Sequence, residues 1–141
     1  MARVSLTFRL LVGFFLFLAT VPPSTARAQS LSEGAIQAAV FVDRAVIAYE
    51  GKRYDEALKE LQEALRLDPE NIDALYYQGI VYAAMDRPGD GLAALEKARK
   101  LRPADADVAF QIGVLHFGEK EYDKAEPFLR EIGRASCRER V

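Results

Sequence analysis

The feature that most constrains this chain is a long, regular internal repeat. Three sets of positions are spaced by 34 in three successive copies: Ala45, Gly79 and Gly113; Ala57, Gly91 and Ala125; Leu61, Leu95 and Leu129. Three pairs have the same spacing: Ala64 and Ala98, Leu67 and Leu101, and Pro69 and Pro103. A period of this length is typical of stacked helix pairs. The sequence therefore predicts an all-α solenoid of antiparallel helix pairs.

The copies are expected at residues 38–71, 72–105 and 106–131, after a short lead-in at residues 29–37. The third copy keeps the period through Leu129 and then loses it. Ile132, Ala135 and Cys137 stand where the earlier copies have alanine, leucine and proline. The chain thus contains about two and a half to three repeats.

The residue types in these slots suit close helix packing. Small residues are expected where two helix backbones approach, and leucines such as Leu129 are expected to fill the remaining space. Pro69 and Pro103 are expected to end the second helices, because proline lacks an N–H and fixes φ. Pro127 is placed near the first turn of the last helix, where its missing donor costs little. The segment RPGDG, residues 87–91, is interpreted as the turn between two helices.

The period and its slots, with YDEA at residues 54–57 and YDKA at residues 122–125, resemble the tetratricopeptide repeat family. The resemblance covers residues 38–131. Some positions depart from the family pattern: Phe41 and Leu75 stand where the family often has tryptophan, and Gly51 lies one place early in the first turn. The resemblance implies that the first helix of each pair lines a concave face, and that this face binds a protein or an extended peptide.

The resemblance also implies which side chains form that binding groove. They are apolar or aromatic residues of the three first helices: Val42, Val46, Tyr49, Tyr76, Tyr77, Ile80, Phe110, Val114 and Phe117. Tyrosine and phenylalanine offer contact area with few rotatable bonds, which suits peptide recognition. Tyr76 and Phe110 are expected to face the ligand, with Asp73 and Asp107 at the edge of the groove. The alternative is that several of these aromatic side chains pack between repeats.

Family members that hold a C-terminal carboxylate use lysine, asparagine and arginine in the groove. The matching positions here hold valine, tyrosine, aspartate and glutamine: Val42, Val46, Tyr77, Asp107 and Gln111. These residues predict that the groove does not clamp a terminal carboxylate.

The residue inventory gives little support to catalysis. The chain has one histidine, His116, and one cysteine, Cys137, and its Cys and His residues show no metal-ligand spacing. His116 stands in the slot of Tyr82, so it is interpreted as a partly buried substitute for an aromatic residue. The sequence predicts a protein that is not an enzyme and that needs no cofactor or metal.

The N-terminus has the three parts of a secretory signal. Arg3 and Arg9 precede an apolar run at residues 10–21, and Ala26-Arg27-Ala28 offers a site for cleavage before Gln29. The apolar run is shorter than the ~20 residues that a membrane-spanning helix needs. We therefore expect a cleaved signal at residues 1–28, no stable membrane span after cleavage, and a periplasmic or secreted protein of the bacterial envelope. An uncleaved anchor is the alternative.

The last ten residues, IGRASCRERV at 132–141, resemble the translation of a sequencing adapter. The alternative is a natural basic tail with a reactive thiol. Because the repeat fails at the same point, these residues are left out of the prediction of the fold.

Removing both ends changes the charge of the chain. The full sequence has a formal net charge of -2, whereas residues 29–131 hold 13 Lys and Arg against 20 Asp and Glu. An acidic domain argues against binding to nucleic acid, which requires a basic surface.

Together these features predict an exported scaffold that binds a protein or peptide partner through an apolar, aromatic groove with an acidic rim. Two alternatives stay open. The repeats form the N-terminal regulatory or assembly segment of a larger envelope enzyme, or the solenoid self-associates through its last repeat.

Overall fold

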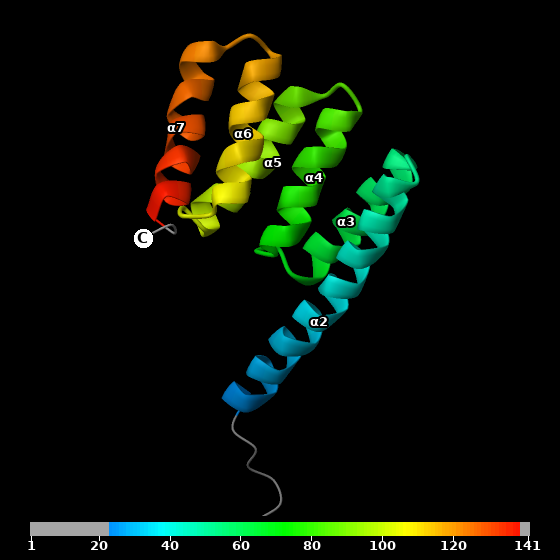
Figure 1. Cartoon of the computed structure of the whole chain (residues 1–141). Helices are drawn as coiled ribbons and strands as arrows, with labels where there is room; N and C mark the ends of the chain where they lie inside the picture. Colours follow the sequence, from blue (N-terminus) through cyan, green and yellow to red (C-terminus); the bar gives the residue numbers. More distant parts are fainter. Residues whose placement is uncertain (1–22, 139–141) are drawn as a thin grey trace, which may run out of the picture. The chain divides into compact units, whose positions relative to one another are not determined.

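The computed structural model describes residues 23–138, with side-chain surroundings for residues 33–133. This range contains six helices and no strand: α2 Pro23–Glu50, α3 Tyr54–Leu67, α4 Ile72–Ala84, α5 Pro88–Leu101, α6 Ala106–Gly118 and α7 Tyr122–Arg138 (Figure 1). None of these helices is both long enough and apolar enough to cross a membrane. The prediction of an all-α solenoid of helix pairs is confirmed.

Two predicted segments lie partly or wholly outside the described residues. The apolar run of the signal, residues 10–21, lies outside, and so do residues 139–141 of the tail. The backbone at the expected cleavage site belongs to α2, and the backbone of residues 132–138 continues α7. The chain divides into two compact units, Met1–Glu33 and Gly34–Val141, and the repeats lie in the second.

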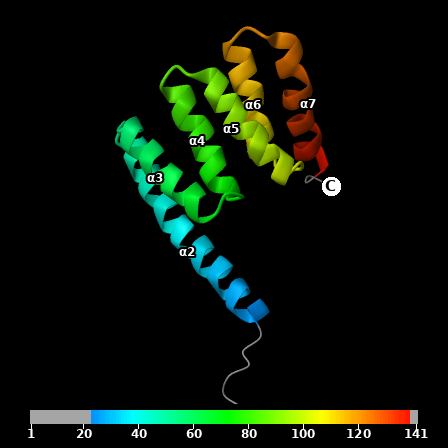
Figure 2. The same ribbon diagram turned by 180° about the vertical axis from the view of Figure 1, so that it is seen from behind.

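Within the second unit, each helix packs against the next one along the chain. Contacts join α3 to α4, α4 to α5, α5 to α6 and α6 to α7. Figures 1 and 2 show α4 beside α5 and α6 beside α7 from opposite sides. The first helices also meet, because α4 contacts α6. This nearest-neighbour arrangement is the one that helix-pair repeats need in order to bury their apolar faces.

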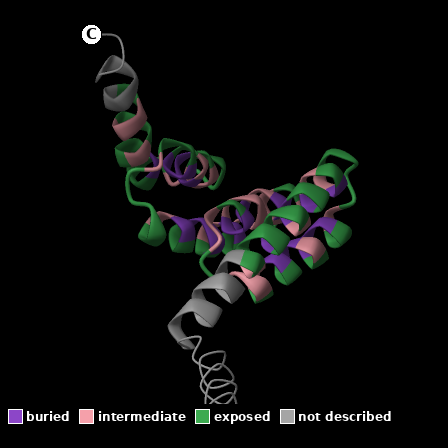
Figure 3. Ribbon diagram, turned by 90° about the horizontal axis from the view of Figure 1, so that it is seen from below, coloured by how far each residue is buried: buried purple, intermediate pink, exposed green. Residues whose placement is uncertain are grey.

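The residues that recur in every copy form the core of this unit. The alanines and glycines of the first two sets are all buried, as are Leu61 and Leu95. Figure 3 shows the buried positions as short purple segments that alternate with pink and green ones along the helices. Leu129 differs from the prediction, since it is 38% exposed. No described helix follows α7 to cover it, although it still packs against Gly113.

Helices α4 and α5 cross at close range, and both sides of the crossing carry glycine. A Cβ atom added to Gly91 would lie 2.8 Å from the backbone oxygen of Gly79, and one added to Gly79 would lie 2.5 Å from Cγ of Leu95. Real Cβ atoms do not approach other atoms this closely. The small residues of the repeat are therefore required by the distance between the two backbones.

The turns inside the three helix pairs recur with the same period. Lys52, Asp86 and Lys120 have φ values of 58°, 59° and 62°. In each turn, the residue that follows the left-handed one donates its N–H to the carbonyl oxygen of the residue five positions earlier. The distance from nitrogen to oxygen is 2.9 Å in all three turns. Gly51 does not take the positive φ, so the left-handed residue of the first turn is a lysine.

Two interpretations of proline-containing segments were wrong. Residues 88–91 are not a turn but the first turn of α5, since Pro88 occupies its first position and the turn ends at Arg87. Proline fits there because its φ is helical and its missing donor is not needed.

Pro127 is the sixth residue of α7 and therefore lies beyond its first turn. Its missing N–H removes one helical hydrogen bond, to the carbonyl of Asp123.

The junctions between repeats are fixed by side-chain caps. Oδ1 of Asn71 accepts a hydrogen bond from the N–H of Ala74 at 2.9 Å, which caps α4. One repeat later, Oδ1 of Asp105 accepts from the N–H groups of Asp107 and Val108 at 3.1 and 3.2 Å. These caps set where α4 and α6 begin, and so they position the first helices that form the groove described next.

Candidate binding groove

The first helices of the three repeats enclose two neighbouring hollows. One, of about 580 Å³, lies between α2 and α4 and is lined by Val42, Asp43, Val46, Ile47, Glu50, Asp73 and Tyr77. The other, of about 230 Å³, lies where α4 meets α6 and the loop before it, and is lined by Ile72, Asp73, Tyr76, Tyr77, Arg102, Asp105, Asp107 and Val108. Asp73 and Tyr77 line both hollows. The two hollows therefore form one groove, which we call the α2–α4–α6 groove.

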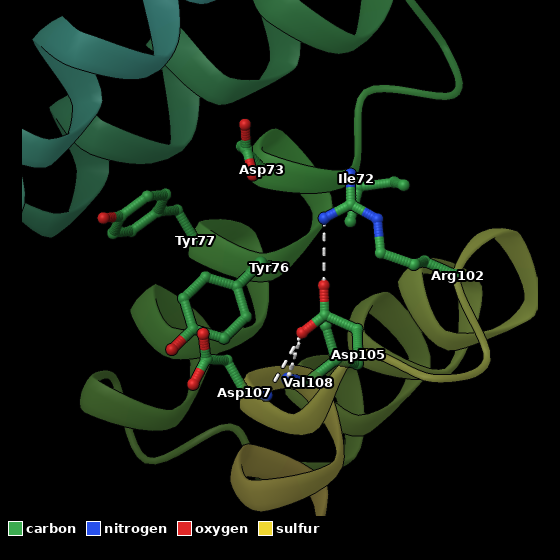
Figure 4. Close-up of a pocket in the computed structure, with 8 residues that line it drawn as sticks. All are labelled: Ile72, Asp73, Tyr76, Tyr77, Arg102, Asp105, Asp107 and Val108. Carbon is green, nitrogen blue, oxygen red and sulfur yellow. Dashed lines mark hydrogen bonds and ion pairs between the residues drawn. The ribbon is translucent and has the colours of Figure 1, made fainter. Parts of the chain in front are cut away.

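Two adjacent tyrosines form the centre of the groove (Figure 4). The rings of Tyr76 and Tyr77 meet edge to face, with centroids 5.4 Å apart and an interplanar angle of 79°. Nε2 of Gln111 on α6 donates a long hydrogen bond to the hydroxyl of Tyr76 at 3.4 Å. This contact joins the side chains of two first helices and helps to fix the Tyr76 ring.

The charged side chains of the groove are mostly acidic. Arg102 is the one cation among the lining residues, and its Nη1 lies 3.0 Å from Oδ2 of Asp105 (Figure 4). The remaining carboxylates, Asp43, Glu50, Asp73 and Asp107, take part in none of the ion pairs found in the described part of the chain. The groove thus presents four carboxylates that no described side chain neutralises in an ion pair.

The surroundings of Tyr77 reflect this charge. Burial raises the pKa of the Tyr77 hydroxyl, and the neighbouring Tyr76, Asp73, Glu50 and Asp43 raise it further. Each of these neighbours disfavours a second negative charge. Tyr77 therefore stays neutral and can donate a hydrogen bond to a ligand at any physiological pH.

The structure brings some of the predicted residues into the groove and not others. Val42, Val46, Tyr76 and Tyr77 line it. The remaining predicted residues do not line either hollow: Tyr49, Ile80, Phe110, Val114 and Phe117. Val42 is also a core residue, since its side chain is buried against α3 and α4.

The copies differ in how far these side chains are buried, and the burial depends on whether a following first helix covers them. Val46 and Tyr49 pack partly into the core beside α4. The equivalent positions in the last copy, Val114 and Phe117, are exposed, because the described residues contain no further first helix to cover α6. The Phe117 ring meets that of Tyr122 at the adjoining turn, with centroids 5.3 Å apart.

Several lining residues were missed at the sequence level. Three of them lie on α2, and each directly follows one of the predicted groove residues of that helix: Asp43, Ile47 and Glu50. This face is exposed and borders the hollow opposite Asp73 and Tyr77 of α4. A pattern of three acidic or apolar residues at i, i+4 and i+7 was the available signal. Asp73 and Asp107 were expected at the edge of the groove, and both line it.

His116 has a packing role, as interpreted. Its ring stacks on that of Phe128 at 6.0 Å, and its Nδ1 lies 2.8 Å from Oε2 of Glu121. Hydrogen bonds from Lys124 and His116 lower the pKa of the Glu121 carboxyl. Among the described residues, no three His, Cys, Asp or Glu side chains are grouped so that they could hold a metal ion.

Comparison with known proteins places the fold in a family. A TPR repeat model matches residues 47–86, and a tetratricopeptide repeat model matches residues 76–136. The chain is 30% identical over 83 residues to Hsp70-Hsp90 organizing protein 1 of Glycine max, which corresponds to 59% of this chain and 14% of that protein. The chain therefore spans about one seventh of the length of this relative.

Two solved structures share the helix arrangement. The crystal structure of MamA superposes with a TM-score of 0.68 and 21% identity, over 73% of this chain and 60% of that one. The second TPR of Spaghetti, bound to the HSP90 peptide SRMEEVD, superposes with a TM-score of 0.69 and 12% identity, over 74% of this chain and 95% of that one. These structures show the fold, and the two family models, which together match residues 47–136, show that the chain is a tetratricopeptide repeat protein.

Proposed function

We propose that this protein is an exported, non-catalytic scaffold that binds a polypeptide partner in the α2–α4–α6 groove. The observation that carries the proposal is the continuity of the groove across the first helices of three successive repeats. The groove combines apolar walls with two tyrosines whose rings and hydroxyls suit contact with a backbone and its side chains. Binding of an HSP90 peptide by a protein of similar fold supports this class of function.

A preformed groove explains how such a scaffold would work. The rings of Tyr76 and Tyr77 contact each other, and Gln111 bonds to Tyr76. Side chains that are already ordered lose little conformational entropy when a ligand binds. The scaffold would therefore hold a partner by presenting a fixed surface, without forming or breaking covalent bonds.

The groove is tested by replacing its tyrosines. Peptides selected from a random library against the intact chain should bind at least about tenfold more weakly to the Tyr76→Ala, Tyr77→Ala variant, because each lost aromatic contact is worth about 1 kcal/mol or more. Fluorescence anisotropy measures the affinity, and circular dichroism confirms that helicity is kept.

Tyr122→Ala is the matched control, since Tyr122 is an exposed tyrosine on α7 that lines neither hollow. It should leave the affinity within about twofold of the unaltered protein. Unchanged binding by the groove variant, or an equal loss in the control, would falsify the groove as the binding surface.

Export is proposed from the signal pattern of residues 1–28. Mass spectrometry of the protein recovered from the medium or periplasm of a bacterial host should show a chain that begins at Gln29. Recovery of the full-length mass alone would support the uncleaved anchor instead.

The alternative of a regulatory segment in a larger enzyme predicts the same groove. It differs in requiring a catalytic domain encoded in the same gene.

A further inference from the structure

The charge of the α2–α4–α6 groove indicates which kind of polypeptide it accepts. Asp43 and Glu50 lie seven residues apart on α2, which places them about 10 Å apart along the helix. Asp73 stands in the first turn of α4, and Asp107 stands in the equivalent position of α6, one repeat later. Negative charge is therefore present on all three helices that line the groove.

The acidic side chains surround apolar and aromatic surface. Val42, Val46 and Ile47 lie in the same hollow as Asp43 and Glu50. A lysine or arginine side chain can place its aliphatic part on such a surface while its charged end reaches a carboxylate. The faces of Tyr76 and Tyr77 add a second favourable environment for a cation.

An acidic segment would meet the opposite conditions. The HSP90 peptide bound by the similar Spaghetti repeat, SRMEEVD, carries two glutamates and an aspartate. In this chain, such a peptide would face Asp43, Glu50, Asp73 and Asp107, while the only lining cation, Arg102, is already paired with Asp105. Like charges at close range cost free energy, and they select against the wrong partner.

We propose that the α2–α4–α6 groove binds an extended segment that carries lysine or arginine residues, with these cations seated on Asp43, Glu50, Asp73 and Asp107 and their aliphatic parts on the tyrosines and valines. The inference rests on the proposed function, because it names the ligand class of the same groove. It distinguishes this groove from one that accepts the acidic HSP90 peptide.

Three fluorescein-labelled peptides of equal length test the ligand class. They have three repeats of Lys-Leu-Ser, Ser-Leu-Ser or Glu-Leu-Ser, with blocked termini. The lysine peptide should bind at least about tenfold more tightly than the serine peptide, and the glutamate peptide should bind most weakly. The affinity for the lysine peptide should fall as salt is raised, because the carboxylates are exposed.

A matched pair of variants separates the groove from the general acidity of the chain. Asp43→Asn with Asp73→Asn removes two groove charges and should weaken binding of the lysine peptide about tenfold. Asp55→Asn with Asp123→Asn removes the same charge from exposed positions in the first turns of α3 and α7. This control should change the affinity less than about twofold.

The outcomes distinguish the inference from the proposed function. Equal affinity for the lysine and serine peptides, with both lost in the Tyr76→Ala, Tyr77→Ala variant, would overturn the ligand class and leave the groove intact. Equal weakening by the two aspartate pairs would show that binding depends on overall charge, which also overturns the inference. Failure of all three peptides to bind would overturn the ligand class, whereas the groove itself is judged by the library-selected peptides and the Tyr76→Ala, Tyr77→Ala variant.

Discussion

Replacing Leu95 with alanine is expected to lower the free energy of unfolding by about 2–5 kcal/mol. The Leu95 side chain is 0% exposed and lies against Gly79 at the crossing of α4 and α5. Its removal would leave a cavity between two helices whose backbones are already in contact, so the site cannot collapse to fill the space. Urea unfolding followed by circular dichroism measures the loss.

The equivalent leucine one repeat later is the control for this prediction. Leu129 occupies the same slot but is 38% exposed. Leu129→Ala should therefore lose markedly less stability than Leu95→Ala, by about 1–2 kcal/mol at most. Equal losses in the two variants would contradict the assignment of Leu95 to a repeat interface covered on both sides.

Replacing Gly91 with alanine is expected to destabilise the protein by about 1–3 kcal/mol. Alanine favours helix over glycine by about 1 kcal/mol, so the variant would be more stable if space allowed. The new methyl group would lie 2.8 Å from the backbone oxygen of Gly79 and 3.3 Å from Cδ1 of Leu115. Because a backbone atom cannot move without moving its helix, overpacking is expected to exceed the gain in helix propensity.

Gly89→Ala isolates the propensity effect, because Gly89 lies in the same helix and a Cβ there would meet no atom within 4 Å. This variant should be as stable as the unaltered protein or more stable by up to about 1 kcal/mol. Gly91→Ala should thus lower the urea midpoint, whereas Gly89→Ala should leave it unchanged or raise it. A stabilised Gly91→Ala protein would show that the α4–α5 crossing is looser than described.

The core residues of this fold were predictable because the short distance between crossing helix backbones limits the size of the side chains there. Where two helix backbones cross as closely as α4 and α5, only small side chains fit, so alanine or glycine recurs at the same slots of every copy. The turns were less predictable. The left-handed position of each turn holds Lys52, Asp86 or Lys120, and none of these is the glycine that would have marked it. The hydrogen bonds around the turn stabilise the strained residue, and they leave no pattern in the sequence.

The groove was only partly predictable for a related reason. The repeat period predicts which helices pack against each other, but it does not show how much of each side chain the neighbouring helix buries. Val42 is therefore largely buried by its neighbours, whereas Phe110, in the same slot of the last copy, is exposed. Asp43 and Glu50 were missed because they lie beside the predicted stripe, on the part of α2 that faces α4. Their importance depends on the contact between repeats, which only the structure shows.

We propose that the first helices of successive repeats form one acidic groove that holds a basic segment. The most direct measurement is an NMR titration of the ¹⁵N-labelled protein with the Lys-Leu-Ser peptide. The largest amide shifts should fall on α2, α4 and the start of α6, around Asp43, Asp73, Tyr77 and Asp107. Shifts centred on α3, α5 and α7, with the groove amides unchanged, would contradict it.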